Sequence, residues 1–210
     1  MKILISRIIY FIFWFLFFGF FFYKLIPKLQ DYVIWGLPDF MGESLFSKRL
    51  WFALHIFFGI VVYITGLIQF TPYIRNKNIG LHRKVGKIYI VSSLLCILSL
   101  YFILPEGTCS ICRISQYIVT NLWLIFLLLA YYFIRQRKII SHQRMMIRSY
   151  ICAIYFVTIR VIDKFAMGIF IFFFKNEDDQ MLASDFSVWL LPLIGFELYW
   201  LISSKNKQLT

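Results

Sequence analysis

The sequence predicts an all-α, polytopic membrane protein, a bundle of six transmembrane helices with both termini in the cytoplasm. Of its 210 residues, 61% are hydrophobic and 15% are charged. A soluble domain carries about 45–50% apolar and about 25% charged residues. The apolar residues gather in runs of membrane-spanning length, and short basic stretches separate these runs. The composition therefore excludes a water-soluble globule, a disordered chain and a small secreted scaffold held together by disulfides.

Six apolar segments supply the expected spans. A helix that crosses a hydrocarbon core of about 30 Å needs about 20 apolar residues. The segments that meet or approach this length are residues 8–26, 50–71, 88–104, 114–134, 149–174 and 186–202. They lack the alternation of barrel strands, and the fifth is long enough to be tilted. We divide the chain into a first transmembrane helix within residues 1–26 and a five-helix membrane core over residues 50–202, with no soluble domain.

The first segment resembles a signal peptide only at its start. Lys2 and Arg7 give it a positive beginning, but the apolar run that follows is long. No cleavage site of the small-x-small type precedes Lys24. We therefore expect this segment to be retained as a signal-anchor-like span.

The loop charges predict the orientation. The gaps at residues 74–87 and 135–148 each hold five Lys or Arg residues and no acid. The positive-inside rule then places these two loops and both termini in the cytoplasm. The same cations suit contact with anionic lipid head groups, and the sequence has no soluble basic–aromatic segment that would indicate a nucleic-acid partner.

A polar stripe follows the second segment. His55, Gly59, Val62, Gly66 and Gln69 are spaced by four, three, four and three residues, which places them on one helix face. The two glycines would let a neighbouring backbone approach closely. Two interpretations stay open for His55 and Gln69: either they bond to adjacent helices, or they belong to a polar route through the membrane.

Two histidines are expected near the cytoplasmic boundary. His82, Gly86 and Tyr89 share one face at the start of the third segment, and His142 lies shortly before the fifth. Two imidazoles at equal depth could ligate a haem iron, bind a quinone or shuttle protons. The alternative is that both histidines contact lipid phosphates among the neighbouring arginines.

Charged residues occur inside two spans. Placing a charge in the hydrocarbon core costs free energy, so these residues are functional candidates. Arg160, Asp163 and Lys164 lie in the fifth segment and Glu197 lies in the sixth. Asp163 and Glu197 are each roughly 16 Å from the outer edge, at 1.5 Å per residue. Because the four charges sum to zero, we expect them to pair with one another inside the bundle. They would form either an ion-pair staple between two helices or part of a functional site.

The sequence also contains a CxxC motif. Cys109 and Cys112 lie on an external loop just before the fourth span, whereas Cys96 and Cys152 lie within spans. An external location permits a disulfide, and a CxxC pair can carry out thiol exchange. A structural or incidental pair is favoured, because there is no second external pair of cysteines that could relay electrons.

Several of these residues together resemble a known family. The chain is similar to the bacterial integral-membrane family catalogued as domain of unknown function 2306, over about residues 50–202. The resemblance rests on His55-x3-Gly59, Gly66-x2-Gln69-Phe70, Arg75, His82-Arg83-x2-Gly86-x2-Tyr89, the run His142-x2-Met145-Met146-Ile147-Arg148-Ser149-Tyr150, Arg160, and Trp189-x2-Pro192-x4-Glu197. Met145 stands where the family has a tryptophan, Phe196 replaces a polar residue, and the CxxC is not part of the pattern. The resemblance implies a multi-pass protein of the bacterial cytoplasmic (inner) membrane, without an assigned activity.

Three hypotheses for the function remain. The favoured one is a membrane redox protein that binds one haem b or a quinone near the cytoplasmic face, with His82, His142, Tyr89 and Arg148 at the cofactor and the two histidines on a haem iron. Three histidines in the whole chain are too few for two bis-histidine haems. The second hypothesis is proton- or ion-coupled transport through His55, Gln69, Arg160, Asp163 and Glu197. The third is a non-catalytic assembly protein with membrane-protein partners or as a homo-oligomer.

Overall fold

The structure, a computed structural model, describes residues 19, 46–106, 109–165 and 167–208. The chain divides into two units, Met1–Leu45 and Phe46–Thr210, and all described residues except Gly19 belong to the second. The predicted first span, residues 8–26, thus lies outside the described residues apart from Gly19, which is helical.

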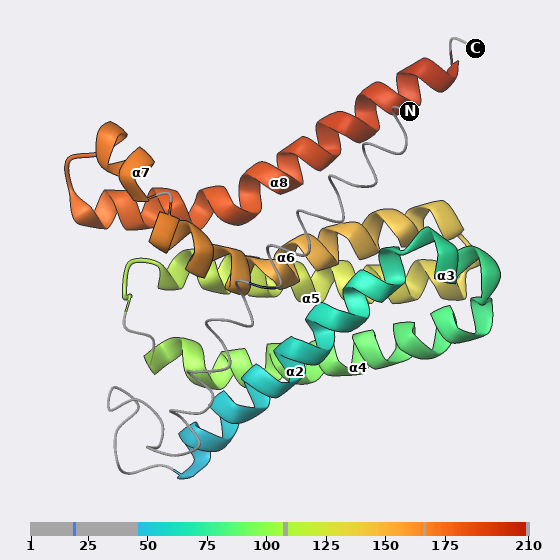
Figure 1. Cartoon of the computed structure of the whole chain (residues 1–210), viewed down its shortest axis with the longest axis horizontal. Helices are drawn as coiled ribbons and strands as arrows, with labels where there is room; N and C mark the ends of the chain where they lie inside the picture. The colour runs from blue at the N-terminus through green and yellow to red at the C-terminus, as the bar shows by residue number, and fades with distance from the viewer. Residues whose placement is uncertain (1–18, 20–45, 107–108, 166, 209–210) are drawn as a thin grey trace. The chain divides into compact units, whose positions relative to one another are not determined.

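The second unit is entirely helical within its described residues (Figure 1). Its helices are α2 (Phe46–Phe70), α3 (Pro72–Lys77), α4 (Ile79–Ile103), α5 (Arg113–Arg135), α6 (Ile139–Phe165), α7 (Met167–Phe173) and α8 (Glu177–Gln208), with a 3-10 turn at Leu104–Glu106. Four helices in the described part are long and apolar enough to cross a membrane, namely Leu50–Phe70, Ile79–Ile103, Arg113–Arg135 and Glu177–Ser203. The all-helical membrane class predicted from the sequence is confirmed at this level.

The helices are longer than the apolar runs that predicted them. Helix α4 begins at Ile79 rather than at residue 88, because the Asn78 side chain caps it by accepting a hydrogen bond from the backbone N–H of Leu81 at 2.9 Å. Its first turns therefore contain His82. Helix α8 likewise begins at Glu177 rather than at residue 186. Three acidic residues occupy its first turn, where their negative charges stabilise the positive end of the helix dipole.

The predicted fifth span, residues 149–174, is not one continuous helix. Helix α6 starts earlier, at Ile139, and ends at Phe165, and α7 follows from Met167 to Phe173. The depth of the charged residues of α6, counted from Phe174 along a single helix, stays a prediction. Continuous hydrophobicity predicts that a segment is apolar, but it does not locate a break within the segment.

Two helix pairs make the most extensive contacts, α2 with α4 and α5 with α6. Helix α8 packs on α6 and α5 through Val188, Trp189 and Leu193. Helices α4 and α6 run in the same direction, each antiparallel to α5 (Figure 1). Fully buried Tyr89, Trp123 and Tyr155 lie in the core that these helices share.

One close approach in the core depends on glycine. A Cβ atom on Gly66 would overlap the ring of Tyr150, whereas a Cβ on Gly59 would have Cys96 Sγ as its nearest neighbour at 3.9 Å. The glycine stripe of α2 thus makes room for a side chain of α6 at Gly66, and not for a neighbouring backbone as the sequence suggested. The hydroxyl of Tyr150 then donates a hydrogen bond to the Tyr63 carbonyl at 3.1 Å.

The turn between α5 and α6 places a bulky residue in the left-handed region. Arg137 has a φ of 58°, and it is the only non-glycine residue with positive φ in the described part of the chain. The N–H of Lys138 donates to the Phe133 carbonyl at 2.9 Å, and the N–H of Arg137 donates to the Ile134 carbonyl at 3.0 Å. This is the Schellman arrangement, which usually carries glycine at the position of Arg137.

Candidate functional site

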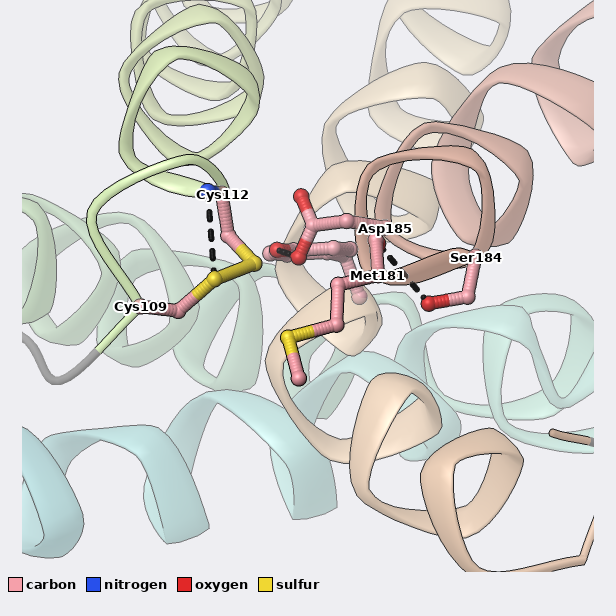
Figure 2. Close-up of a disulfide and its surroundings, with 6 residues drawn as sticks. Cys109, Cys112, Met181, Ser184 and Asp185 are labelled. Atoms are coloured by element: carbon pink, nitrogen blue, oxygen red, sulfur yellow. Dashed lines mark hydrogen bonds between the residues drawn. A yellow bond between two sulfur atoms is a disulfide. The ribbon is translucent and has the colours of Figure 1, made fainter. Parts of the chain in front are cut away.

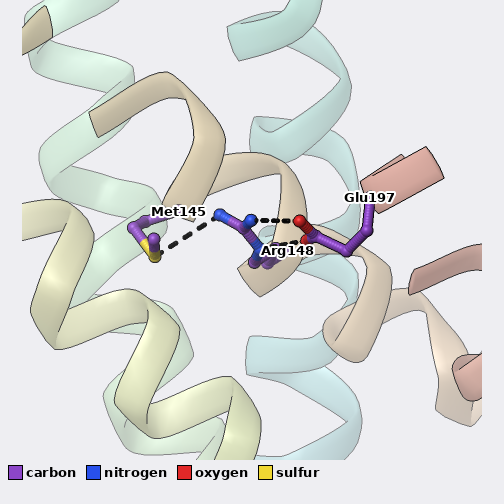
Figure 3. Close-up of polar contacts among 3 residues, drawn as sticks. All are labelled: Met145, Arg148 and Glu197. Carbon is purple, nitrogen blue, oxygen red and sulfur yellow. Dashed lines mark hydrogen bonds and ion pairs between the residues drawn. The ribbon is translucent and has the colours of Figure 1, made fainter. Parts of the chain in front are cut away.

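An ion pair joins α6 to α8. Arg148 Nε donates to Glu197 Oε1 at 2.6 Å, and Nη2 donates to Oε2 at 2.7 Å (Figure 3). The Arg148 side chain is 10% exposed, and that of Glu197 is 42% exposed. Two parallel charge-assisted hydrogen bonds fix both the distance and the orientation of the groups. The pair therefore has one buried partner and one partner that remains accessible.

Aromatic side chains of α8 flank this ion pair. The Arg148 guanidinium lies 5.4 Å from the centre of the Phe196 ring, and that of Arg144 lies 4.6 Å from the centre of the Trp200 ring. Met145 Sδ is 3.8 Å from Arg148 Nη1. Two cations on successive turns of α6 are thus held by a carboxylate and two aromatic rings of α8.

The charges inside the spans do not pair as the sequence suggested. Glu197 bonds Arg148, which the sequence placed at the cofactor, and not the cations of the Arg160–Asp163–Lys164 group. Arg160 is exposed and interacts electrostatically with His55, Tyr155 and Asp185. The side chains of Asp163 and Lys164 lie outside the described residues.

The two candidate histidines lie at the same level of the bundle. Tyr89 of α4 and Ser149 of α6 share a hydrogen bond of 3.0 Å between their hydroxyl groups. His82 precedes Tyr89 by seven residues in α4, and His142 precedes Ser149 by seven residues in α6. Seven residues span about 10.5 Å along each of these parallel helices. His142 Nδ1 lies 2.8 Å from the carbonyl oxygen of Ala130 in α5. Because a carbonyl only accepts, Nδ1 carries the proton in this contact.

Tyr89, which the sequence placed at a cofactor, has no exposed surface. Its hydroxyl shares a hydrogen bond with Ser149 that links α4 to α6, and it also interacts with the side chains of Ser93 and Trp123. Gln69 is also buried, and its Nε2 donates to the carbonyl of His82 at 2.8 Å. This bond ties the end of α2 to the first turns of α4 and fixes the backbone at His82.

At the other end of the α2–α4 pair, a histidine meets a cysteine. His55 Nδ1 lies 3.3 Å from Cys96 Sγ, and the imidazole makes an edge contact with the Phe156 ring. The sequence placed His55 on the polar stripe but gave no indication of its partner. Cys96 is 2% exposed, so that its thiol is shielded from reagents.

A second buried polar cluster joins α5, α6 and α8. Tyr155 donates a hydrogen bond of 2.6 Å to Asp185 Oδ1, and Trp189 Nε1 donates to Ser115 Oγ at 2.9 Å. Asp185 is 2% exposed, although it directly precedes the predicted sixth span, residues 186–202. The longer α8 carries Asp185 into the bundle two turns after the acidic start of the helix.

Cys109 and Cys112 are joined by a disulfide directly before α5. Met181, Ser184 and Asp185 of α8 lie around it (Figure 2). Sequence reasoning missed the roles of Asp185, Ser115 and Tyr155 in this region. The one indication in the sequence was that Asp185 is a polar residue at the edge of an apolar run. Within the described residues, no group of three or more His, Cys, Asp or Glu side chains is arranged to hold a metal ion.

The comparisons with known proteins identify the family. The family model described as "Predicted membrane protein (DUF2306)" matches residues 52–200. The chain belongs to the DUF2306 family. The resemblance noted in the sequence is thereby confirmed, and the DUF2306 segment includes the Arg148–Glu197 pair, the three histidines and the disulfide. No curated protein and no solved structure matches the chain.

Proposed function

We propose that the chain is a membrane redox protein that binds one haem b or one quinone between the beginnings of α4 and α6, held by His82 and His142. The observation that carries this proposal is the hydrogen bond from His142 Nδ1 to the Ala130 carbonyl at 2.8 Å. With its proton on Nδ1, a neutral His142 keeps a lone pair on Nε2. Histidines that ligate metals typically donate their other ring N–H to a carbonyl or carboxylate in this way.

The level of His82 supports the same site. Its helix runs parallel to α6, and the Tyr89–Ser149 bond sets the register between the two helices. The bond from Gln69 to the His82 carbonyl holds the turn that carries the imidazole. The two imidazoles could hold one haem iron through ring nitrogens that carry a lone pair. A quinone carbonyl only accepts, so His142 could bond it only when Nε2 is also protonated. Either group would accept and pass on electrons when bound.

An absorption spectrum of the purified protein tests this proposal. We expect a Soret band that shifts on reduction with dithionite if the group is haem, or a quinone in the organic extract if it is not. His142→Ala should abolish the signal, whereas His55→Ala at the other end of the α2–α4 pair should retain it. A protein that folds and carries neither haem nor quinone contradicts the proposal.

We also propose that the chain crosses the bacterial cytoplasmic (inner) membrane six times, with both termini in the cytoplasm. The basic loops before α4 and between α5 and α6 support this orientation. Lys and Arg there would contact anionic lipids. Reporter fusions after residues 77 and 137 should be active only with a cytoplasmic reporter, and a fusion after residue 176 only with an external one. The opposite pattern would contradict this topology.

A second candidate function, proton-coupled transport, is favoured by the exposure of Glu197. Its carboxylate lies in a candidate span and is 42% exposed, although it bonds a buried arginine. A carboxylate that releases Arg148 on protonation could carry a proton between two conformations. Glu197→Gln should then abolish proton-driven flux in vesicles while the protein remains folded. Unchanged flux in that variant excludes this candidate.

A further inference from the structure

The disulfide before α5 has two unequal sulfur atoms. Cys112 is 7% exposed, whereas Cys109 is half-buried. The backbone N–H of Cys112 lies 3.2 Å from Cys109 Sγ and donates to it. A hydrogen bond from a helix N-terminus stabilises a thiolate more than a disulfide sulfur. The sulfur of the more exposed cysteine is thus also the one placed to hold negative charge.

A buried carboxyl group accompanies the less accessible sulfur. Asp185 lies beside the disulfide with its side chain turned toward Cys112 (Figure 2). Oδ1 accepts the Tyr155 hydroxyl, and Oδ2 makes no hydrogen bond of ordinary geometry, although the Ser115 side chain interacts with the same carboxyl group. Arg160 is the charged group that interacts with Asp185 from α6. Asp185 is 2% exposed, and Oδ2 is the carboxyl oxygen available to exchange a proton with a neighbouring thiol.

We propose that Cys109–Cys112 is a redox-active pair that undergoes thiol–disulfide exchange with a dithiol reductant, and that Asp185 transfers the proton to and from Cys112. This activity lies beyond the proposed cofactor site, because it concerns the opposite end of α5 and does not involve the histidines.

The exchange proceeds in two steps. A thiolate of the reductant attacks Cys109 Sγ, forming a mixed disulfide, and the bond between the two cysteines breaks. Cys112 leaves as a thiolate and takes a proton from the acid form of Asp185. The second thiol of the reductant then loses its proton, which restores the acid form of Asp185, and its sulfur attacks the reductant's other sulfur in the mixed disulfide. Cys109 leaves as a thiolate that accepts the Cys112 N–H. Two electrons thereby pass from the reductant, which becomes a disulfide, to the cysteine pair.

The first arm of the test measures access to the two sulfur atoms. In the folded full-length protein in detergent, a maleimide should label Cys109 in Cys112→Ala at least 10-fold faster than Cys112 in Cys109→Ala. Dithiothreitol should reduce the wild-type pair without denaturant, and oxidised dithiothreitol should restore it. If the pair is reduced only after unfolding, or if both cysteines label at equal rates, the proposal is wrong.

The second arm tests the proton transfer. Asp185→Asn keeps an oxygen that accepts from Tyr155 but removes the acid, and reduction by dithiothreitol should slow by about 10-fold. Asp179→Asn, on an exposed acid of the same helix, should leave the rate unchanged. The melting temperatures of both variants identify any loss of folding. The maleimide labelling experiment uses neither variant, so that its result does not depend on how they fold. Equal rates in wild type and Asp185→Asn overturn the role of Asp185.

Discussion

Arg148 of α6 and Glu197 of α8 are joined by two parallel hydrogen bonds, of 2.6 and 2.7 Å. This contact connects the charged face of α6 to the distal half of α8, where most other side chains, among them Leu198, Tyr199 and Leu201, are exposed. The ion pair, together with the contacts of Phe196 and Trp200 with the two arginines, connects this part of α8 to α6. The stability of the α6–α8 contact should therefore depend on the geometry of the pair and not on charge alone.

Removing one partner of this pair should destabilise the protein. We expect Glu197→Ala to lower the free energy of unfolding by about 2 kcal/mol, less than for a fully buried pair because the carboxylate is partly exposed. Arg148→Lys retains the charge but loses the bidentate contact, and should cost about 1 kcal/mol. Unfolding in SDS, followed by circular dichroism, measures both.

The paired replacement is the control. Arg148→Met together with Glu197→Leu should recover much of the stability lost in Glu197→Ala, because no charge is then left buried without a partner. If the double variant is as unstable as the single one, the loss comes from packing around α8 and not from the ion pair.

The contact between Gly66 and Tyr150 predicts a strong effect of one added methyl group. Gly66→Ala should lower the free energy of unfolding by about 1–3 kcal/mol, because the new Cβ overlaps the Tyr150 ring. Gly59→Ala on the same helix face should be tolerated, since its nearest neighbour is at ordinary contact distance. The two variants are compared by thermal unfolding in the same detergent. Equal effects would show that helix propensity, and not the contact, determines the result.

The left-handed backbone at Arg137 predicts a stabilising substitution. Arg137→Gly should raise the free energy of unfolding by about 1 kcal/mol, because glycine adopts positive φ without steric cost. Gln136→Gly, at a φ of −82°, should give no gain and a small loss. SDS unfolding midpoints of the two variants test this difference. A gain of the same size at both positions would contradict the explanation.

Much of the fold follows from the sequence because the bilayer imposes a length and a composition on its spans. The apolar runs at residues 50–71 and 114–134 match α2 and α5 closely. The ends of α4 and α8 were misplaced, since capping by Asn78 and the acidic first turn extend these helices beyond their apolar regions. The break after Phe165 has no equivalent in the hydrophobicity of the sequence.

The site was predictable in its residues but less so in its pairings. Helical spacing placed His55 and Gln69 on one face of α2, and the sequence marked Arg148 and Glu197 as candidates. The sequence pattern could not show that Arg148 reaches Glu197. Such a pairing depends on how each helix is rotated about its own axis, and helical spacing alone does not give that rotation. The buried position of Asp185 was missed because an acid close to other acids resembles a loop residue.

The proposed cofactor site is tested most directly by the amount of haem and quinone that copurifies with each chain. For the wild-type protein we predict a stoichiometry of about one cofactor per chain, which is the most that a single site between two imidazoles can hold. The amount should fall to background in His142→Ala and remain unchanged in His55→Ala. A wild-type protein that is folded but contains only traces of either group, or a His142→Ala variant that retains the full amount, would contradict the account.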